Sequence, residues 1–260
     1  MFDKILRLKN ISVVYGAKKV LHDINFSLQR GEILVIAGES GSGKSTILKA
    51  IDGLLGKGGG IIEGEIFFCG QEITVLSDGQ RRKISGAEIG MIFQNAGASF
   101  CPIRTVGEQI FESVAAHRDW TEKEFRERAK VIMKNINLEE SALDEYPFRL
   151  SGGMAQRAGI LAAMILEPKL LLADEPTSAL DAVTQVGVVK ELLKLRDRHG
   201  ISIVMVTHHM GVAWYIADKI LIMRNGRQVE FGTKEQIFNS PQEDYTRELI
   251  NAVPRFERSK

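Results

Sequence analysis

Residues 33–51 read ILVIAGESGSGKSTILKAI, and they set the architecture that we expect of the whole chain. The continuous apolar run at 33–36 is typical of a strand that is buried on both faces of a mostly parallel sheet. A helix is predicted to begin within residues 43–45 and to end near Gly53. The glycine-rich turn at 38–45 joins this strand to this helix.

The turn at 38–45 fits the pattern GxxxxGK[ST], in the strand–turn–helix context that the pattern requires. Its glycines allow backbone N–H groups to turn inward and approach phosphate oxygens closely, and the helix N-terminus adds about half a positive charge. Lys44 is expected to reach the β and γ phosphates of a nucleoside triphosphate, and Ser45 to hold Mg²⁺. The residues predicted to bind the triphosphate are Gly38, Ser40, Gly41, Ser42, Gly43, Lys44, Ser45 and Thr46.

The composition excludes several classes of protein. The 260 residues can bury one sizeable core, or one core and a small lobe. Because 34 Lys and Arg residues balance 33 Asp and Glu residues, no large net charge draws the chain to nucleic acid or to an anionic membrane. Two cysteines without a CxxC pair argue against a disulfide scaffold or a zinc site and suit a reducing cytosol. The chain shows no apolar signal core at its start, and no apolar run is long enough to cross a membrane by itself.

The rest of the chain alternates between strand and helix patterns, which predicts an α/β fold with right-handed crossovers. Further strands are expected at residues 5–8, 11–14, 25–28, 66–69, 170–173, 201–206, 220–223 and 228–231. The last two would form a hairpin, because Asn225 and Gly226 between them are typical of a type I′ turn. The glycine-rich residues 56–60 are expected to form a mobile loop.

The middle of the chain differs because its apolar residues recur at helical spacing. Residues 121–124 form a capping box, which predicts the start of a helix. One face of that helix is marked by Phe125, Ala129, Ile132, Met133 and Ile136. We therefore predict a helical lobe at residues 93–158, inserted between two parts of a sheet domain.

Two carboxylates follow the apolar strand at 170–173. Asp174 is expected to orient Mg²⁺, through water, and Glu175 to polarise an attacking water as general base. Taken alone, the pair is better explained as two solvated acids at the end of a strand. The phosphate-binding pattern far upstream reverses that preference and favours catalysis.

Another buried strand, at 203–206, ends in polar residues. At the carboxyl edge of a parallel sheet, His208 would contact the γ phosphate and the attacking water. A lone histidine at the end of a strand is more often structural, and His209 beside it competes for the role. The phase of the strand favours His208.

Ser151, Gly152 and Gly153 precede a strong helical run. They would present a hydroxyl and N–H groups at a helix N-terminus, which is a second anion-binding arrangement. An ordinary Ser N-cap is the alternative. Because one nucleotide needs only one such site, we expect the second to serve a nucleotide that another subunit holds.

Together these segments resemble the nucleotide-binding subunit of an ABC transporter. Residues 150–154 match the signature of that family, and residues 178–181 match its D-loop. The resemblance implies a P-loop NTPase (RecA-like) core with a mostly parallel sheet, an N-terminal antiparallel β subdomain and an inserted α-helical subdomain. It divides a single ABC ATPase domain, 1–260, into a core at 1–92 and 159–235, a helical subdomain at 93–158 and a C-terminal tail at 236–260.

The resemblance also assigns roles to residues. Tyr15 stands where the family has an aromatic that stacks on adenine, and Gln94 matches the Q-loop glutamine that begins the helical lobe. Without the family resemblance, Tyr15 could equally be an aromatic at the end of a strand that fills a surface gap. Gln94 could equally be an exposed residue in a turn. The implied catalytic residues are Lys44, Gln94, Glu175 and His208, and the implied Mg²⁺ ligands are Ser45, Gln94 and Asp174.

Two such subunits would pair head to tail. Each ATP would then lie between the phosphate loop of one subunit and Ser151, Gly152 and Gly153 of the other. Asp181, in the D-loop, is assigned to the same nucleotide site, and it would equally serve as the cap of the helix that follows.

Two segments resemble the peptide and nickel importer subfamily more closely. They are residues 99–110, after the Q-loop, and residues 240–250, with a Pro-x-x-x-Tyr-Thr-Arg pattern; Met154 stands where other ABC subunits have Gln. That subfamily imports dipeptides, oligopeptides, glutathione-like peptides, nickel or metal–metallophore complexes. The cysteine-bearing C-terminal extension of some peptide-importing relatives is missing, which favours the nickel or metallophore members. His209 departs from the pattern, since many relatives have Asp there.

The resemblance implies ATP and Mg²⁺ as cofactors and a position at the cytoplasmic face of the cell membrane. Its partners would be a second ATPase subunit (a paralogue in this subfamily), two transmembrane permeases and, indirectly, an extracytoplasmic substrate-binding protein, with no nucleic acid. The alternative is a soluble ABC ATPase that acts on DNA or ribosomes, but the chain has no inserted coiled coil, zinc module or second cassette. A P-loop kinase or GTPase is disfavoured, because the 150–154 signature is present and no Asn-Lys-x-Asp motif occurs.

Overall fold

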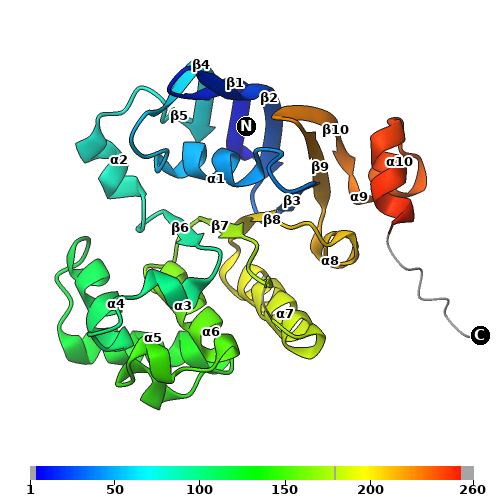
Figure 1. Cartoon of the computed structure of the whole chain (residues 1–260). Helices are drawn as coiled ribbons and strands as arrows, with labels where there is room; N and C mark the ends of the chain where they lie inside the picture. The colour runs from blue at the N-terminus through cyan, green and yellow to red at the C-terminus, as the bar shows by residue number, and fades with distance from the viewer. Residues whose placement is uncertain (1–3, 179, 253–260) are drawn as a thin grey trace, which may run out of the picture.

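The apolar run at 33–36 forms β3, a strand inside a mixed sheet; the computed structural model describes residues 4–178 and 180–252 (Figure 1). In that part of the chain, ten strands form one sheet in the order β5-β4-β1-β2-β10-β9-β3-β8-β7-β6. The strands are β1 (Lys4–Tyr15), β2 (Lys18–Gln29), β3 (Ile33–Gly38), β4 (Gly59–Phe68), β5 (Gln71–Glu72), β6 (Ile89–Ile92), β7 (Leu170–Asp174), β8 (Ser202–Val206), β9 (Lys219–Arg224) and β10 (Arg227–Thr233).

The sheet has a parallel part and an antiparallel part. Strands β6, β7, β8, β3 and β9 pair in parallel, whereas β1 pairs antiparallel with both β2 and β4. One parallel pair of residues, Arg227 and His22, joins β10 to β2 and links the two parts. The predicted α/β class, with a mostly parallel core and an antiparallel N-terminal part, is confirmed.

The side chains of β3 alternate between two apolar cores. Ile33 and Val35 pack with the helices of the middle of the chain, whereas Leu34 and Ile36 pack with α1 and the antiparallel strands. All residues of β3, β7 and β8 are buried. Both faces of the parallel sheet are therefore covered, which explains why these strands read as continuous apolar runs.

The helices lie on both faces of this sheet. They are α1 (Lys44–Asp52), α2 (Asp78–Ile84), α3 (Ala96–Ser99), α4 (Val106–Ala115), α5 (Glu122–Asn135), α6 (Gly152–Met164), α7 (Ala182–His199), α8 (Met210–Ile216), α9 (Lys234–Asn239) and α10 (Asp244–Asn251), with 3₁₀ turns at Glu140–Leu143 and Pro147–Arg149. In Figure 1, α3 to α6 gather away from β1, β2 and β4, and α10 lies on the opposite side, next to β10. Among the described residues, no helix combines the length and the apolar character that a membrane span requires.

Local signals predict several elements correctly. Thr121 Oγ1 accepts a hydrogen bond from the Glu124 N–H at 3.3 Å, and the Glu124 carboxylate accepts one from the Thr121 N–H at 2.8 Å, as a capping box requires. Helix α1 ends at Gly53, which has a left-handed conformation. Asn225 and Gly226, between β9 and β10, both have positive φ, as a type I′ turn requires. The predicted apolar face of α5 is buried, including Phe125, Ala129, Ile132, Met133 and, just after the helix, Ile136.

Other elements differ from the prediction. Residues 56–60 are not all loop, because Gly59 and Gly60 belong to β4 and pair with β1. Helix α2 is not predicted, because none of its residues is buried and it therefore lacks apolar periodicity. The capping box between Ser77 and Gln80 was the available signal for it. Ala179, in the predicted D-loop, lies outside the described residues.

Candidate functional site

The turn at 38–45 has a conformation that requires glycine at two positions. Gly43, just before α1, has a φ of 97°, and a Cβ there would lie 2.6 Å from Leu21 Cδ2. Gly38 has a φ of 146°, and a Cβ there would lie 2.1 Å from the carbonyl oxygen of Met223. The loop therefore packs tightly against β2 on one side and β9 on the other.

Lys44, the first residue of α1, has a buried ammonium group. Its Nζ donates hydrogen bonds to the carbonyl oxygens of Gly38 at 2.9 Å and Glu39 at 2.7 Å. Burial lowers the pKa of Lys44, while the nearby Glu175 and Asp174 act in the opposite direction. The site thus contains a cation with little access to water, which a phosphate group would stabilise.

Ser45 and Asp174 provide a pair of oxygen ligands. Ser45 Oγ donates to Asp174 Oδ1 at 2.7 Å. Burial raises the pKa of Asp174 although this hydrogen bond lowers it. A hydroxyl and a carboxylate are oxygen donors of the kind that Mg²⁺ prefers. Within the described part of the chain, no group of three or more His, Cys, Asp or Glu side chains could hold a metal alone. A Mg²⁺ ion here would therefore need further oxygens from the substrate, as is usual where phosphates are bound.

Glu175 follows β7 in a left-handed conformation, with a φ of 45°, which is uncommon outside glycine and typical of functional positions. Both oxygens of its carboxylate have partners. Gln94 Nε2 donates to Oε2 at 3.2 Å, and His208 Nδ1 lies 3.2 Å from Oε1. These partners come from the ends of β6 and β8, so three neighbouring strands of the sheet place one carboxylate.

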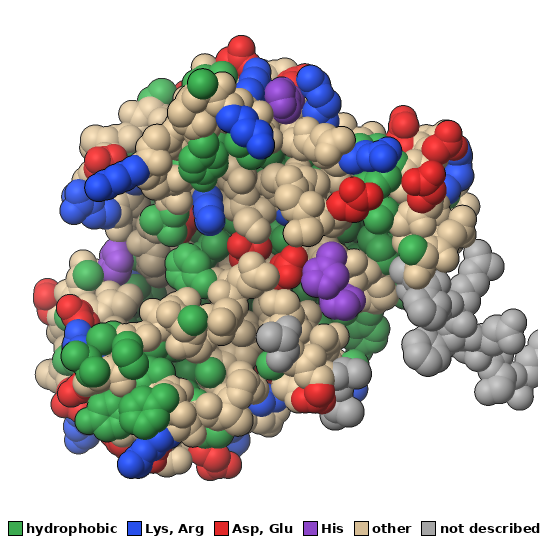
Figure 2. Space-filling view, in the orientation of Figure 1, with side chains coloured by type: hydrophobic (Ala, Val, Ile, Leu, Met, Phe, Trp, Pro, Cys, Tyr) green, Lys and Arg blue, Asp and Glu red, His purple; other side chains and the backbone are tan. Residues whose placement is uncertain are grey.

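The phosphate loop and Glu175 share one cavity of about 490 Å³, a volume within the usual range of ligand sites. Its lining residues are Val20, Ser40, Gly41, Gly43, Lys44, Ser45, Thr46, Gln94, Glu175 and His208. Figure 2 shows acidic and histidine side chains gathered near the middle of this face, below α1 and beside α8. The sequence does not predict Val20, because it is an ordinary strand residue that reaches the cavity only through the packing of β2 against the loop. Ser42 Oγ is buried in the loop and lacks a hydrogen-bond partner among the described residues.

Ser151, Gly152 and Gly153 are not among the residues that line this cavity. Ser151 Oγ accepts from the Met154 N–H at 3.3 Å and caps α6. Asp181 accepts from the Thr184 N–H at 3.0 Å and caps α7 in the same way. Within one chain both residues therefore act as helix caps.

Tyr15 also lies outside the lining of the cavity. It ends β1, is partly exposed, and its ring is close enough to Gly59 that a Cβ there would lie 2.8 Å from Tyr15 Cε1. It pairs with Lys18 of β2, so it lies at the same end of the β1–β2 ladder as Val20.

Residues 21–178 match the family model described as ABC transporter. That range includes the phosphate loop, Gln94, the cap of α6 and the paired acids. The chain belongs to the ABC transporter family. It is an ABC ATPase, and a soluble role on DNA or ribosomes is not favoured.

Curated relatives of this ABC ATPase match nearly its full length. The dipeptide transport ATP-binding protein DppD of Escherichia coli (strain K12) is 37% identical over 98% of this chain and 80% of its own. DppD of Lactococcus lactis subsp. cremoris (strain MG1363) is 38% identical over 99% of this chain and 76% of its own. The glutathione import ATP-binding protein GsiA of Escherichia coli (strain K12) is 39% identical, and this chain spans 43% of its length.

Solved structures of ABC proteins have the same fold. One is a dimeric structure of a post-hydrolysis state of the ATP-binding cassette MJ0796 bound to ADP and Pi, with a TM-score of 0.78 and 31% identity over 88% of this chain and 98% of that chain. Another is cbiO1 from Clostridium perfringens, part of the ABC transporter complex cbiONQ, with a TM-score of 0.79 and 27% identity over 97% of each chain.

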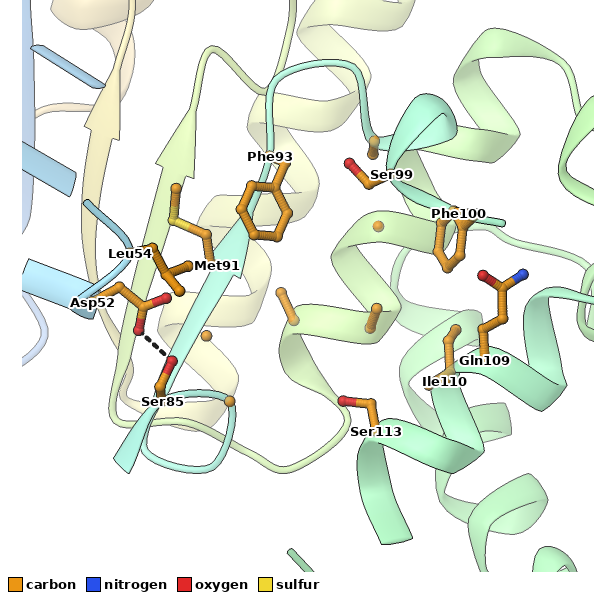
Figure 3. Close-up of a pocket in the computed structure, with 16 residues that line it drawn as sticks. Asp52, Leu54, Ser85, Met91, Phe93, Ser99, Phe100, Gln109, Ile110 and Ser113 are labelled. Atoms are coloured by element: carbon orange, nitrogen blue, oxygen red, sulfur yellow. Dashed lines mark hydrogen bonds between the residues drawn. The ribbon is translucent and has the colours of Figure 1, made fainter. Parts of the chain in front are cut away.

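A second cavity of about 360 Å³ lies in this ABC ATPase between β6 and α4 (Figure 3). Met91 and Phe93 line one side of it, and Gln109 and Ile110 line the other. Leu54, also in the lining, and Phe93 are 45% and 42% exposed, so apolar surface is left at the rim. Because Phe93 directly precedes Gln94, this cavity and the phosphate site share one segment of chain.

Proposed function

We propose that this subunit hydrolyses MgATP in the cavity at the phosphate loop and thereby energises an ABC importer of peptides. The observation that carries the proposal is the placement of Glu175, whose carboxylate has Gln94 and His208 as partners and lies beside Lys44. The relatives named for dipeptide transport and glutathione import support peptides as the substrate. Nickel or a metal–metallophore complex, which the resemblance to the peptide and nickel importer subfamily also allows, is the alternative substrate.

In this proposal, the loop binds the phosphates of ATP. Lys44 keeps the Gly38 carbonyl as one partner and donates its remaining N–H groups to β and γ phosphate oxygens, and the N-terminus of α1 adds its partial positive charge. Tyr15 stacks on the adenine, supported by its partly exposed ring at the end of β1. The other residues assigned to the nucleotide are Gly38, Ser40, Gly41, Ser42, Gly43, Ser45 and Thr46.

Ser45, Asp174 and Gln94 are the residues that would hold Mg²⁺, since they supply hydroxyl, carboxylate and amide oxygens; Ser45 and Gln94 line the cavity, and Asp174 accepts from Ser45 Oγ behind it. When bound, the ion would neutralise charge on the β and γ phosphate oxygens. Asp174 must be ionised for this role, so Ser45 and Lys44, which both favour its charged form, also support the binding of the cation.

Glu175 acts on the attacking water. It accepts a proton while the water oxygen forms a bond to the γ phosphorus and the bond to the bridging oxygen breaks, which gives ADP and phosphate. His208 and Gln94 keep the carboxylate in the cavity, so it is oriented before the substrate arrives.

The site of one chain is proposed to be completed by a second ATPase subunit, a paralogue. Ser151, Gly152, Gly153 and Asp181 lie outside the cavity of their own chain and would meet the nucleotide of the partner. The neighbour MJ0796, described as dimeric, supports this arrangement.

Two transmembrane permeases are the further partners, with the subunit at the cytoplasmic face of the membrane and an extracytoplasmic substrate-binding protein acting indirectly. We assign residues 93–158 to a helical subdomain between two parts of the core, 1–92 and 159–235, with a tail at 236–260. The cavity between β6 and α4, with Phe93 next to Gln94, would carry the closure of the ATP site to the permeases.

Uptake of labelled dipeptide, glutathione and nickel tests the proposal in a strain that lacks the gene. We expect the wild-type gene to restore peptide uptake. Glu175→Gln should keep ATP binding but restore no uptake, because the base is lost. Restoration of nickel uptake alone would overturn the choice of substrate, and full ATPase activity of the Glu175→Gln protein would overturn the role of Glu175.

A further inference from the structure

The tail of the chain reaches the phosphate loop. Tyr245, the second residue of α10, is 6% exposed, and its hydroxyl accepts a hydrogen bond from the backbone N–H of Glu39 at 3.2 Å. We infer that Tyr245 is a positioning residue of the ATP site, which holds the first peptide group of the phosphate loop in the orientation that Lys44 needs. The inference rests on the proposed function of that loop.

The geometry of one peptide group carries this inference. The N–H of Glu39 and the carbonyl of Gly38 belong to the same planar unit, in which they point in opposite directions. The Gly38 carbonyl accepts from Lys44 Nζ at 2.9 Å, and the Glu39 N–H donates to Tyr245. A rotation of this unit would therefore break both bonds, so Tyr245 and Lys44 are linked through a single rigid group.

The tyrosine itself is held firmly. The guanidinium of Arg224, at the end of β9, lies 4.5 Å from the centre of its ring. Burial raises the pKa of the Tyr245 phenol, although the hydrogen bond from the Glu39 N–H and the Arg224 cation act in the opposite direction. The hydroxyl is thus neutral at physiological pH.

Hydrogen bonds hold the segment before α10 in two ways: to β10 and to Arg247 of α10. The Glu230 carboxylate of β10 accepts from the N–H groups of Gln242 at 2.9 Å and Glu243 at 3.2 Å. Arg247 donates to the carbonyl oxygens of Pro241 at 3.3 Å and Gln242 at 2.7 Å. The Pro-x-x-x-Tyr-Thr-Arg pattern thereby has a physical reading: Arg247 and Glu230 order the turn, and the turn places the tyrosine.

The hairpin that carries Arg224 also contacts the loop. The Gly226 N–H, in the turn between β9 and β10, donates to the Ser42 carbonyl at 3.0 Å. The hairpin and α10 therefore support the outer side of the phosphate loop together, at Ser42 and at Glu39. These contacts lie outside the cavity, so Tyr245 acts through the loop and does not touch the substrate.

The test is Tyr245→Phe in the full chain, with Thr246→Val as the matched control. Phe keeps the ring under Arg224 but leaves the Glu39 N–H without its acceptor. Thr246 is fully buried next to Tyr245, but its hydroxyl has no hydrogen-bond partner in the described part of the chain, so Val removes nothing that the loop uses. We expect Tyr245→Phe to raise the KM for ATP about 3- to 10-fold, the effect of one hydrogen bond, with little change in kcat at saturating ATP.

Equilibrium binding of ATP, measured with Mg²⁺ chelated so that no hydrolysis occurs, separates the two proposals. If the wild type binds ATP but shows no turnover, the proposed function fails. The Kd of Tyr245→Phe for ATP still decides in that case whether Tyr245 positions the phosphate loop. We expect that Kd to rise by the same 3- to 10-fold and that of Thr246→Val to stay at the wild-type value. An unchanged Kd in Tyr245→Phe, or an equal rise in both variants, would overturn the inference.

Discussion

At the scale of single residues, burial shifts the pKa values of two charged groups of the ATP site in opposite directions. It lowers the pKa of Lys44 and raises the pKa of Asp174, so both ionised forms are less stable in the free protein than in water. Bound phosphate would stabilise the lysine cation, and a bound cation would stabilise the aspartate. The site is therefore suited to bind an anionic phosphate and a cation together.

Asp52 shows the same effect away from the phosphates and allows a prediction on pH. It ends α1, is 5% exposed and accepts from Ser85 Oγ at 2.7 Å; burial raises its pKa although Ser85 and Arg81 lower it. A carboxyl with a raised pKa in the folded state contributes most to stability below its unfolded pKa, and this contribution is lost as the pH rises through the folded pKa.

We therefore expect the free energy of unfolding of the wild type to fall as the pH rises from the ordinary aspartate pKa to the raised pKa of Asp52. Asp52→Asn has no carboxyl at this position, so its free energy of unfolding should fall less steeply over the same pH range. Urea unfolding at a series of pH values measures the difference. Asp119→Asn, at an exposed position, is the control and should follow the wild type. Parallel curves for the wild type and Asp52→Asn would contradict the prediction.

At the scale of elements, an ion pair joins the two helices that Ser151 and Asp181 cap. Arg157 of α6 donates from Nε and Nη2 to Glu191 Oε1 of α7, each at 3.1 Å, and Asn137 donates to the same oxygen at 3.2 Å. The Glu191 side chain is only 2% exposed. Helix α6 starts after Ser151 and α7 after Asp181, so this pair fixes their relative position.

Removal of only one partner should be far more harmful than removal of both. We expect Arg157→Leu to lower the free energy of unfolding by about 3 kcal/mol, because it leaves a buried carboxylate without a cation and with Asn137 as its remaining donor. Arg157→Leu with Glu191→Leu should be close to neutral, within about 1 kcal/mol of the wild type. Urea denaturation of the two variants decides the point. A double variant as unstable as the single one would contradict this explanation, because removal of the carboxylate would then restore no stability.

At the scale of the whole molecule, the proposed pairing of two subunits would complete the ATP site with residues that lie outside the cavity of their own chain. Apart from its sequence neighbours and the backbone of its own helix, a Cβ on Gly152 would have no heavy atom within 4 Å among the residues that the structure describes, so a larger side chain there fits without strain. Its place at the N-terminus of α6 is where the nucleotide of the partner is proposed to bind. The same position is thus tolerant in one chain and, in the proposed pair, would be critical.

We expect Gly152→Asp to leave the stability of the chain and the binding of ATP to its own loop unchanged, while it abolishes ATP-dependent association with the second ATPase subunit. The added carboxylate would repel the partner's phosphates. Light scattering with ATP in a Glu175→Gln background, which prevents turnover, measures the association. Gly79→Asp, at an equally open position in α2, is the control. Normal pairing of the Gly152→Asp protein would contradict the head-to-tail arrangement.

Local sequence was sufficient for much of the fold. The strand and phosphate loop at 33–45, the capping box at Thr121 and the hairpin turn at Asn225 each depend on interactions between residues close in sequence. Helix α2 was not predicted, because it buries no side chain and so has no apolar pattern. The roles of the paired acids are predicted from their position after a strand together with the phosphate-binding pattern far upstream, since strand ends of a parallel sheet meet at one edge.

Contacts between distant segments could be decided only by the tertiary structure. The partners of Glu175 and the entry of Val20 into the cavity depend on which strands are neighbours in the sheet. The hydrogen bond from Glu39 to Tyr245 joins residues 206 positions apart, and it exists because β9 and β10 place α10 beside the loop. No periodicity records such a contact, because it depends on the packing of elements and not on the chemistry within any one of them.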